Sequence, residues 1–383
     1  MNNEVISYSK KIGFLRRGYS STGGAEAYLK RLAEGLRQQG YRVILLGTGE
    51  WPAAEWPGGE VVALPEKSLR DIGASALQIK QEKKMNLLFS FERVPGCDIF
   101  RAGDGVHAAW LERQLRTQSW WRRLLIQISP KHREIVRLER ELFSHKSQTR
   151  IIANSQMVAQ EIMNYFKVPS SRIDVIYNGV PISKLVTSAE RIALRKKFGV
   201  GEKEFVVLFV GSGWKRKGLG IALQAVKDAM EKNPQSAITL WVAGKGNTHQ
   251  YRSSVVKFLG PIKNLSEIYA AADLFILPTL YDPFSNASLE ALAAGLPVIT
   301  SSANGCSEIL KPDVHGTIID DPCDGKAFAA AVSEWKERLQ DPHEAERIRH
   351  VCAMRGASLN LEVNIKATMR VIESASYRLD NGH

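Results

Sequence analysis

The chain of 383 residues has few cysteines, and the four that it has are far apart: Cys97, Cys306, Cys323 and Cys352. No two of them form a C-x-x-C pair, so the sequence offers neither a zinc ribbon nor a dithiol redox motif. Four cysteines are also too few for a disulfide scaffold in a chain of this length. We therefore expect a protein of the reducing cytoplasm.

Long apolar runs are missing as well. No stretch approaches the roughly 18 uninterrupted apolar residues that a membrane-spanning helix needs. The N-terminal segment becomes charged again at Arg16 and Arg17, before the apolar core of a signal peptide has formed. The expectation is a protein that is neither secreted through a standard signal nor inserted across a membrane.

Two further absences concern partners and cofactors. No Asp-x-Asp triplet occurs in the chain, which argues against a metal-bound diphosphate, and we expect neither a metal site nor another cofactor. The net charge is +12, yet there is no helix-turn-helix cue, zinc finger or aromatic RNA-binding strand. We therefore expect no nucleic-acid partner.

The positive charge is concentrated between residues 111 and 150. This segment holds ten basic and four acidic residues, and so carries half of the net charge. It also contains Trp120, Trp121, Arg122 and Arg123, followed by an aliphatic run. Trp prefers the depth of lipid headgroups, and Lys and Arg are drawn to anionic headgroups, so the segment indicates a surface that meets an anionic membrane. A solvated helix face over an ordinary core is the alternative.

Short apolar, β-branched runs alternate with segments of helical period along the chain, which is typical of βαβ units in parallel sheets. The predicted fold class is α/β with two Rossmann-like domains, and the length is sufficient for two cores. Helices are expected at residues 25–39, 188–198, 324–339, 343–355 and 361–378. Strands are expected at 11–15, 42–46, 60–64, 86–91, 98–101, 150–153, 173–177, 204–210, 237–242, 255–259, 274–277, 297–300 and 316–319.

A glycine-rich turn between a strand and a helix is the most informative segment. Gly211 and Gly213 follow the strand, and Arg216, Lys217 and Gly218 precede the helix. Such a turn gathers backbone N–H groups and the positive end of the helix dipole at one point, to which the two cations add full charges. The spacing fits neither G-x-G-x-x-G nor the P-loop. The segment indicates a diphosphate site built with cationic side chains, with a basic surface turn as the alternative.

A second strand, loop and helix follow at residues 274–292. Asp282 lies in the loop and Glu290 inside the helix. A carboxylate accepts hydrogen bonds from two hydroxyls at once, so the pair suits the ribose and the sugar of a nucleotide-sugar. The backbone amides of Phe284, Ser285 and Asn286 are expected to face the diphosphate or the sugar. An acidic pair at this spacing also fits compensation of the helix dipole beside a solvated helix face.

The N-terminal half offers two polar loops. Gly23 and Gly24 form a turn after the first strand, where a ligand can approach the backbone. Asp104 and His107 follow the fifth strand, at the carboxyl edge where open α/β sheets bind their ligands. A plain tight turn and a turn aspartate between glycines are the simpler explanations.

Together these features resemble the retaining glycosyltransferases of family 4, which have the two-Rossmann GT-B fold. The strongest signal is Asp282 to Glu290 followed by Gly295-Leu296-Pro297, and Asn178-Gly179-Val180 matches the family's domain crossover. Residues 95–104, and the basic Trp-containing region after them, are most similar to the lipopolysaccharide core glucosyltransferases. Further matching segments are residues 23–24, 211–218, 244–246 and 271–278.

The resemblance implies a retaining, metal-independent hexosyltransferase with its active site in the cleft between the domains. Residues 1–183 would bind the acceptor, residues 184–360 the UDP-sugar, and residues 361–383 would form a helix that returns to the N-terminal domain. The expected donor is UDP-glucose, and the expected acceptor a phosphorylated glycolipid of the lipopolysaccharide core. The enzyme would be cytoplasmic and peripheral on the inner face of the cytoplasmic membrane. Asp282 and Ser285 stand where the family commonly has Glu and Gly, which leaves the donor sugar open.

Carried onto this chain, the resemblance gives catalytic roles to Asp104, Arg216, Lys217 and Asp282. Arg216 and Lys217 would stabilise the departing diphosphate, and Asp104 would accept a hydrogen bond near the reaction centre. The residues expected to contact the acceptor or the membrane are His107, Trp120, Trp121, Arg122 and Arg123. The donor-binding set is Gly23, Gly24, Gly211, Gly213, Arg216, Lys217, Gly244, Asp282, Phe284, Ser285, Asn286 and Glu290.

Other functions remain open at this point. A UDP-sugar 2-epimerase of GT-B shape would share the diphosphate site but would need acid and base groups that move a proton on the donor itself. A glycosyltransferase of capsule or other glycolipid synthesis would differ only in its acceptor. A non-enzymatic basic protein that binds nucleic acid or membrane would show strong salt dependence without affinity for UDP.

Overall fold

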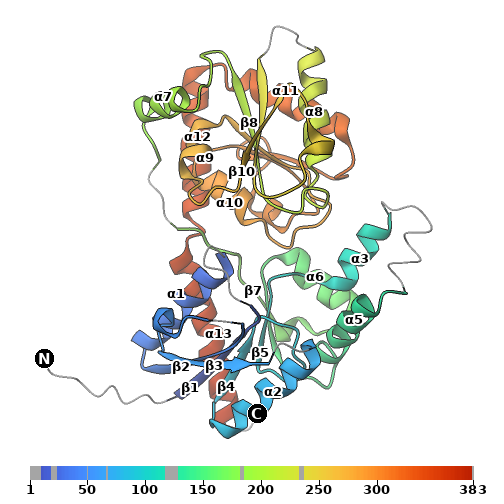
Figure 1. The fold of residues 1–383 in the computed structure, drawn as a ribbon, viewed down its shortest axis with the longest axis vertical. Helices are drawn as coiled ribbons and strands as arrows, with labels where there is room; N and C mark the ends of the chain where they lie inside the picture. Colours follow the sequence, from blue (N-terminus) through green and yellow to red (C-terminus); the bar gives the residue numbers. More distant parts are fainter. Residues whose placement is uncertain are drawn as a thin grey trace, which may run out of the picture. The chain divides into compact units, whose positions relative to one another are not determined.

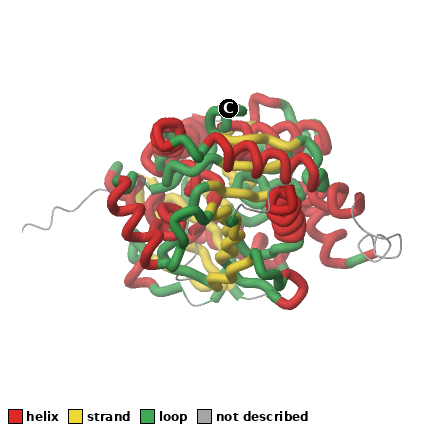
Figure 2. Tube along the Cα trace, turned by 90° about the horizontal axis from the view of Figure 1, so that it is seen from above, coloured by secondary structure: helices red, strands yellow, loops and turns green. Residues whose placement is uncertain are grey.

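The structure is a computed structural model that describes residues 10–18, 24–49, 51–65, 68–116, 128–181, 185–232 and 237–381. The chain divides into two compact units. Unit 1 consists of Met1–Tyr177 together with Glu362–His383, and unit 2 of Asn178–Leu361. Helices flank the strands, which are drawn in yellow in Figure 2.

Unit 1 contains a parallel sheet in the order β3-β2-β1-β4-β5-β6-β7. Alternate residues of its strands face opposite sides, so Phe14 enters one apolar cluster and Leu15 the other. The strands are β1 (Lys10–Arg16), β2 (Tyr41–Thr48), β3 (Glu60–Leu64), β4 (Leu87–Ser90), β5 (Ile99–Ala102), β6 (Arg150–Ala153) and β7 (Ile173–Val175).

Helices cover both faces of this sheet. The helix that ends the chain packs beside the first helix, and Ile372 joins Leu29 and Leu32 in one buried cluster (Figure 1). The helices of unit 1 are α1 (Gly24–Gln38), α2 (Leu69–Glu82), α3 (His107–Arg116), α5 (Pro130–Leu142), α6 (Gln156–Phe166) and α13 (Leu361–Asn381).

Unit 2 contains a second parallel sheet, in the order β10-β9-β8-β11-β12-β13. Its central strands are buried along their whole length, which explains their continuous apolar sequences. The strands are β8 (Phe205–Val210), β9 (Ile238–Ala243), β10 (Val256–Gly260), β11 (Leu274–Leu277), β12 (Val298–Ser301) and β13 (Gly316–Ile319). The helices are α7 (Ser188–Lys197), α8 (Leu219–Lys232), α9 (Ser266–Ala271), α10 (Asn286–Ala293), α11 (Gly325–Arg338) and α12 (Pro342–Ala357).

Local sequence fixes where several of these helices begin. Thr187 and Glu190 form a reciprocal capping box at α7, and the side chains of Ser285, Asp324 and Asp341 cap α10, α11 and α12. The strands predicted from the sequence are confirmed, with ends that shift by at most two residues. The predicted pair of Rossmann-like sheets is confirmed as well.

The order of the strands indicates which edge of each sheet would bind a ligand. In both sheets the order reverses beside the first strand of the unit, between β1 and β4 and between β8 and β11. Open α/β sheets bind ligands outside the carboxyl ends of the strands at such a switch point. Across the described residues, no helix is long and apolar enough to cross a membrane.

Candidate active site

The glycine turn after β8 places a lysine against the backbone. Gly211 and Gly213 have φ of +148° and +71°, values that L side chains rarely adopt. A Cβ on Gly211 would lie 2.7 Å from Cδ and 2.9 Å from Nζ of Lys217. Glycine at this position therefore provides the space that Lys217 occupies.

A second glycine turn, after β9, supports the first. Gly244 has φ of +130°, and a Cβ on it would lie 2.1 Å from the carbonyl oxygen of Gly211. A Cβ on Gly246 would lie 2.3 Å from the indole of Trp214. The two turns can pack this closely only because both glycines lack a side chain.

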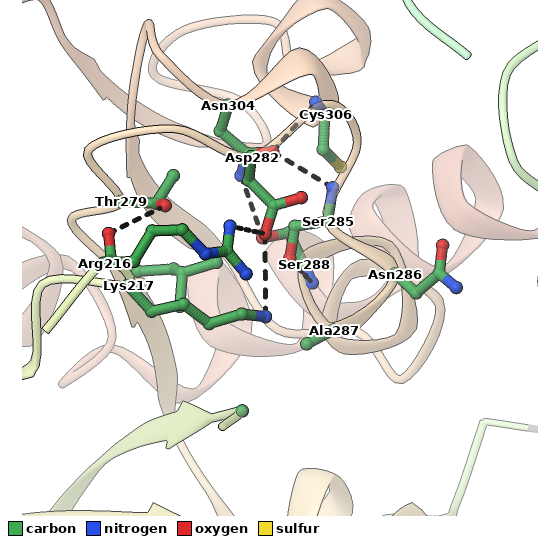
Figure 3. A network of polar contacts seen from close by, with 12 residues as sticks. Arg216, Lys217, Thr279, Asp282, Ser285, Asn286, Ala287, Ser288, Asn304 and Cys306 are labelled. Atoms are coloured by element: carbon green, nitrogen blue, oxygen red, sulfur yellow. Dashed lines mark hydrogen bonds and ion pairs between the residues drawn. The ribbon is translucent and has the colours of Figure 1, made fainter. Parts of the chain in front are cut away.

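Asp282 brings the loop after β11 to this cationic turn. Its Oδ2 lies 3.6 Å from Nζ of Lys217 and 3.8 Å from Nη1 of Arg216 (Figure 3). Arg216 also donates to the carbonyl oxygen of Tyr281. These three charged residues come from two separate sequence motifs, and the structure places them together. One carboxylate against two cations leaves the cluster with a net positive charge.

Asn304 holds the Asp282 loop in shape. Its Oδ1 accepts from the amides of Ser285 and Cys306 at 3.1 Å each, and its Nδ2 donates to Ser288 and Thr300. Backbone bonds join Asp282 to the same segment, since Gly305 N donates to its carbonyl at 2.9 Å. Asn304 was not predicted from the sequence, although it is a polar residue shortly after β12, at the edge where ligands bind.

One sequence prediction about this loop is wrong. The amide of Ser285, expected to face the ligand, donates to Asn304 inside the protein, and the Ser285 hydroxyl caps α10 by accepting from Ser288 N at 3.2 Å. Ser285 and Phe284 are both buried. The amides of Asn286 and Ala287 come before the first bond within the helix, so they are the ones that point toward the start of α10.

Glu290 lies one turn inside α10 and is held by a tyrosine of α9. Tyr269 donates its hydroxyl to Oε2 of Glu290 at 3.0 Å. Burial raises the pKa of the Glu290 carboxyl, while the Tyr269 hydroxyl and the Lys217 charge oppose that rise. A cavity of about 410 Å³, whose lining includes Glu290, Tyr269, Leu265 and Val180, opens beside this pair. Tyr269 was not predicted as a site residue, because a tyrosine at helical spacing is more typical of the buried core of a helix.

In unit 1, the Asp104 turn follows β5. Asp104 is exposed, and Gly105 after it has φ of +69°. His107 begins α3, and its Nε2 lies 3.0 Å from Nδ1 of His132. Burial and the Arg93 charge lower the pKa of His107 to about 4, so this imidazole is neutral near pH 7.

Charged residues that the sequence analysis missed lie at the switch point of unit 1. Nη1 of Arg16, at the end of β1, lies 3.4 Å from Glu92 after β4, and Nη2 lies 3.8 Å from Glu26. Burial raises the pKa of Glu92, against the amide of Arg17 and the charge of Arg16. The available signal was a charged residue near the carboxyl end of each of these two central strands, Arg16 as the last residue of β1 and Glu92 two residues after β4.

Several predicted residues cannot be placed. Gly23 and the segment with Trp120, Trp121, Arg122 and Arg123 lie outside the described residues, while Gly24 is the first residue of α1. In the part of the chain that the structure describes, no three His, Cys, Asp or Glu side chains form a cluster that could hold a metal ion.

Known families match both units. A family model described as Glycosyltransferase Family 4 matches residues 22–184, and one described as Glycosyl transferases group 1 matches residues 204–337. The lipopolysaccharide glucosyltransferase WaaG of Escherichia coli K12 is 23% identical over 329 residues, which cover 81% of this chain and 85% of WaaG. The uncharacterized glycosyltransferase MJ1607 of Methanocaldococcus jannaschii is 30% identical over 190 residues, 46% of this chain and 48% of that protein. The chain thus spans about half the length of some curated relatives.

Solved structures share the arrangement of the sheets. The crystal structure of WaaG, a glycosyltransferase involved in lipopolysaccharide biosynthesis, has a TM-score of 0.73 at 21% identity, covering 89% of this chain and 95% of that one. The Anabaena protein Alr3699/HepE in complex with UDP-glucose has a TM-score of 0.70 at 20% identity, covering 95% and 99%. Both likenesses establish the fold.

Proposed function

We propose that this chain, which belongs to the glycosyltransferases of GT-B fold, transfers a hexose from a UDP-sugar to a phosphorylated glycolipid with retention at the anomeric carbon. Glucose is the expected hexose and the lipopolysaccharide core the expected acceptor. The observation that carries the proposal is the cluster of Arg216, Lys217 and Asp282 at the switch point of unit 2. The similarity to WaaG supports the choice of donor and acceptor.

Unit 2 holds the donor in this proposal. Lys217 and Arg216 bind the diphosphate, whose negative charge grows as the bond to the sugar breaks, and fixed cations stabilise that charge without a metal ion. The amides of Asn286 and Ala287 at the start of α10 add to this site. Glu290 accepts the ribose hydroxyls, and the cavity beside it receives the nucleoside. Asp282 accepts a hydroxyl of the donor sugar.

Unit 1 binds the acceptor. Asp104 accepts a hydrogen bond close to the reacting carbon, and neutral His107 offers a ring nitrogen without adding a charge. The acceptor hydroxyl attacks from the face that the phosphate leaves, so its proton passes to the departing diphosphate oxygen while the new glycosidic bond forms. This step retains the configuration of the anomeric carbon.

The enzyme acts at an anionic membrane surface. Within the described residues, α5 carries the exposed Arg133, Arg137 and Arg140 on the side opposite the buried Leu138 and Leu142. Cationic faces of this kind are attracted to anionic headgroups. Together with the adjacent tryptophan pair of the sequence, they support a peripheral position on the inner face of the cytoplasmic membrane.

The reaction is tested by incubating the protein with UDP-glucose, other UDP-hexoses and a lipopolysaccharide core acceptor. The product's anomeric configuration is read by NMR, and an α-linked product from an α-linked donor is expected. Lys217→Ala and Glu290→Ala abolish transfer with the fold intact, whereas Lys215→Ala, an exposed neighbour, does not. Conversion of the UDP-sugar without acceptor would instead indicate an epimerase.

Membrane binding is tested by flotation with liposomes. Vesicles that contain anionic lipid are expected to carry the protein, and neutral vesicles are not. Replacement of Trp120, Trp121, Arg122 and Arg123 by Ala should abolish flotation. Unchanged binding of that variant to anionic liposomes would refute the membrane part of the proposal.

A further inference from the structure

A fully buried carboxylate on α5 lies against the Asp104 turn. Glu139 has no exposed surface, and its Oε1 accepts from the amide of His107 at 2.7 Å and from Nε of Arg93 at 2.9 Å. Its Oε2 accepts from the amide of Ala108 at 3.3 Å. The first turn of α3 is thus capped from another helix.

Arg93 extends this contact to the turn itself. Besides binding Glu139, it donates through Nη2 to the carbonyl oxygen of Gly105 at 2.9 Å. On the other side of Asp104, Asn154 donates to the carbonyl oxygen of Gly103 at 3.1 Å. The carbonyl groups of Gly103 and Gly105, the residues on either side of Asp104, are therefore fixed by side chains from two separate loops, while the Asp104 side chain stays exposed.

Capping of α3 alone does not require a buried carboxylate from another helix paired with an arginine. A Ser, Thr or Asp directly before α3 would satisfy its first amides at the surface, yet Val106, which is buried, stands there. A buried ion pair costs desolvation and adds little net stability over apolar packing. What the pair adds here is a fixed geometry for the turn.

We propose that Glu139 is a positioning residue, which through Arg93 and the first amides of α3 sets the places of Asp104 and His107 for the transfer reaction. The inference rests on the proposed function for the roles of those two residues. It requires that loss of the Glu139 charge disturbs the acceptor side of the reaction and leaves the donor site in unit 2 unchanged.

Glu139→Gln tests this, because the amide keeps the size of the side chain but sets an NH₂ group against donors. We expect kcat to fall about 10- to 100-fold, the effect of a misplacement near 1 Å, while the Kd for UDP stays within about twofold. Glu141→Gln removes an exposed carboxylate of the same helix, paired with Arg70 and Arg137, and should keep the kcat of the wild type.

Leu142→Ala separates positioning from stability. This apolar residue is buried on α5 and its side chain cannot hydrogen-bond to the Glu139 carboxylate, so its variant loses stability through a cavity and keeps the bonds of Glu139. Below its Tm it should keep kcat. A Glu139→Gln enzyme that is as active as Leu142→Ala at equal folded fraction would overturn the inference.

A readout without turnover keeps the inference separable from the proposed function. Hydrogen exchange of the His107 and Ala108 amides, measured by NMR, should be slow in the wild type and at least about tenfold faster in Glu139→Gln, because both amides donate to the Glu139 carboxylate. Unchanged exchange rates overturn the inference. If the wild type transfers no sugar from any UDP-sugar, the proposed function fails, and the exchange rates still decide the role of Glu139 in the turn.

Discussion

Tyr269 controls how far the Glu290 carboxyl stays ionised inside unit 2. Its hydroxyl donates to the carboxylate and opposes the rise in pKa that burial causes. Tyr269→Phe removes that bond, so the pKa of Glu290 rises further. We expect about fivefold weaker UDP binding at pH 7.5, from the loss of one buried hydrogen bond, measured by calorimetry.

The pH dependence of UDP binding shows whether the Tyr269 hydroxyl acts through the protonation of Glu290. Protonation removes the charge with which Glu290 accepts the ribose hydroxyls, so UDP affinity decreases as the pH falls. In Tyr269→Phe the decrease should begin at a higher pH than in the wild type. A parallel curve for the two proteins would show that the hydroxyl does not act through Glu290.

His107 makes unit 1 sensitive to mild acid. In the folded protein burial, and then the charges of Arg93, His132 and Lys131, lower its pKa to about 4, whereas the unfolded chain binds a proton near pH 6.5. Between those values the unfolded state binds more protons, so stability falls as the pH falls from about 6.5 to 4. His107→Asn should show a smaller drop in Tm over this range, and an equal drop would contradict the assignment.

In the candidate site of unit 2, the residues that could be predicted are those that belong to a recognisable sequence motif. Arg216, Lys217 and Asp282 were named from two motifs and lie together. Tyr269 and Asn304 were not named, because their role depends on which side chains the fold brings within hydrogen-bond distance. The Ser285 amide was misassigned for the same reason.

The two glycine turns of unit 2 act as one element. A Cβ on Gly244 would lie 2.1 Å from the Gly211 carbonyl oxygen, so Gly244→Ala must displace the turn that carries Lys217. We expect about 1–3 kcal/mol of lost stability from the backbone strain, together with about tenfold or more weaker UDP binding.

Gly220→Ala is the matched control for this variant. Gly220 lies in the first turn of α8, and an added Cβ would meet nothing closer than Tyr251 Cε1 at 3.7 Å. Alanine there should raise stability by up to about 1 kcal/mol and leave UDP binding unchanged. If Gly244→Ala also kept its UDP affinity, the second turn would not support the first.

The strands were predictable to within two residues because the central ones are continuously apolar. Four of the five predicted helices agree equally well, and α7 carries its own cap in the sequence, whereas α13 continues to Asn381, three residues beyond its predicted end. Which first-turn amides of α10 stay available was not predictable, because that depends on Asn304 from a different segment.

At the scale of the whole chain, the last helix belongs to unit 1. Met369, Ile372 and Ala375 of α13 are buried in the same cluster as Leu29 and Leu32 of α1. A chain that ends at Leu361 loses these contacts, so we expect unit 1 to unfold at a lower temperature. Saturating UDP should still raise the calorimetric transition of unit 2 in that truncated chain. Loss of the UDP-induced shift would contradict the division into two units.

The net charge of +12 is not spread evenly along the chain. Half of it lies in residues 111–150, which include α5, and a separate pair, Arg216 and Lys217, lies on the glycine turn of unit 2. A basic chain without such clusters would suggest polyanions in general. This distribution supports one surface for an anionic membrane and one site for a diphosphate.

The most direct test of the account is a calorimetric titration of UDP, UMP and uridine into the wild type, Lys217→Ala, Glu290→Ala and the control Lys215→Ala. Lys217→Ala should weaken UDP about 10- to 100-fold, the loss of a charge-assisted contact, and uridine far less, because Lys217 acts on the ribose only through the charge of Glu290. Glu290→Ala should weaken all three ligands, and the control none. A loss of uridine binding as large as that of UDP in Lys217→Ala, or UDP binding that does not depend on Lys217, would contradict the assignment of the diphosphate to the cationic turn.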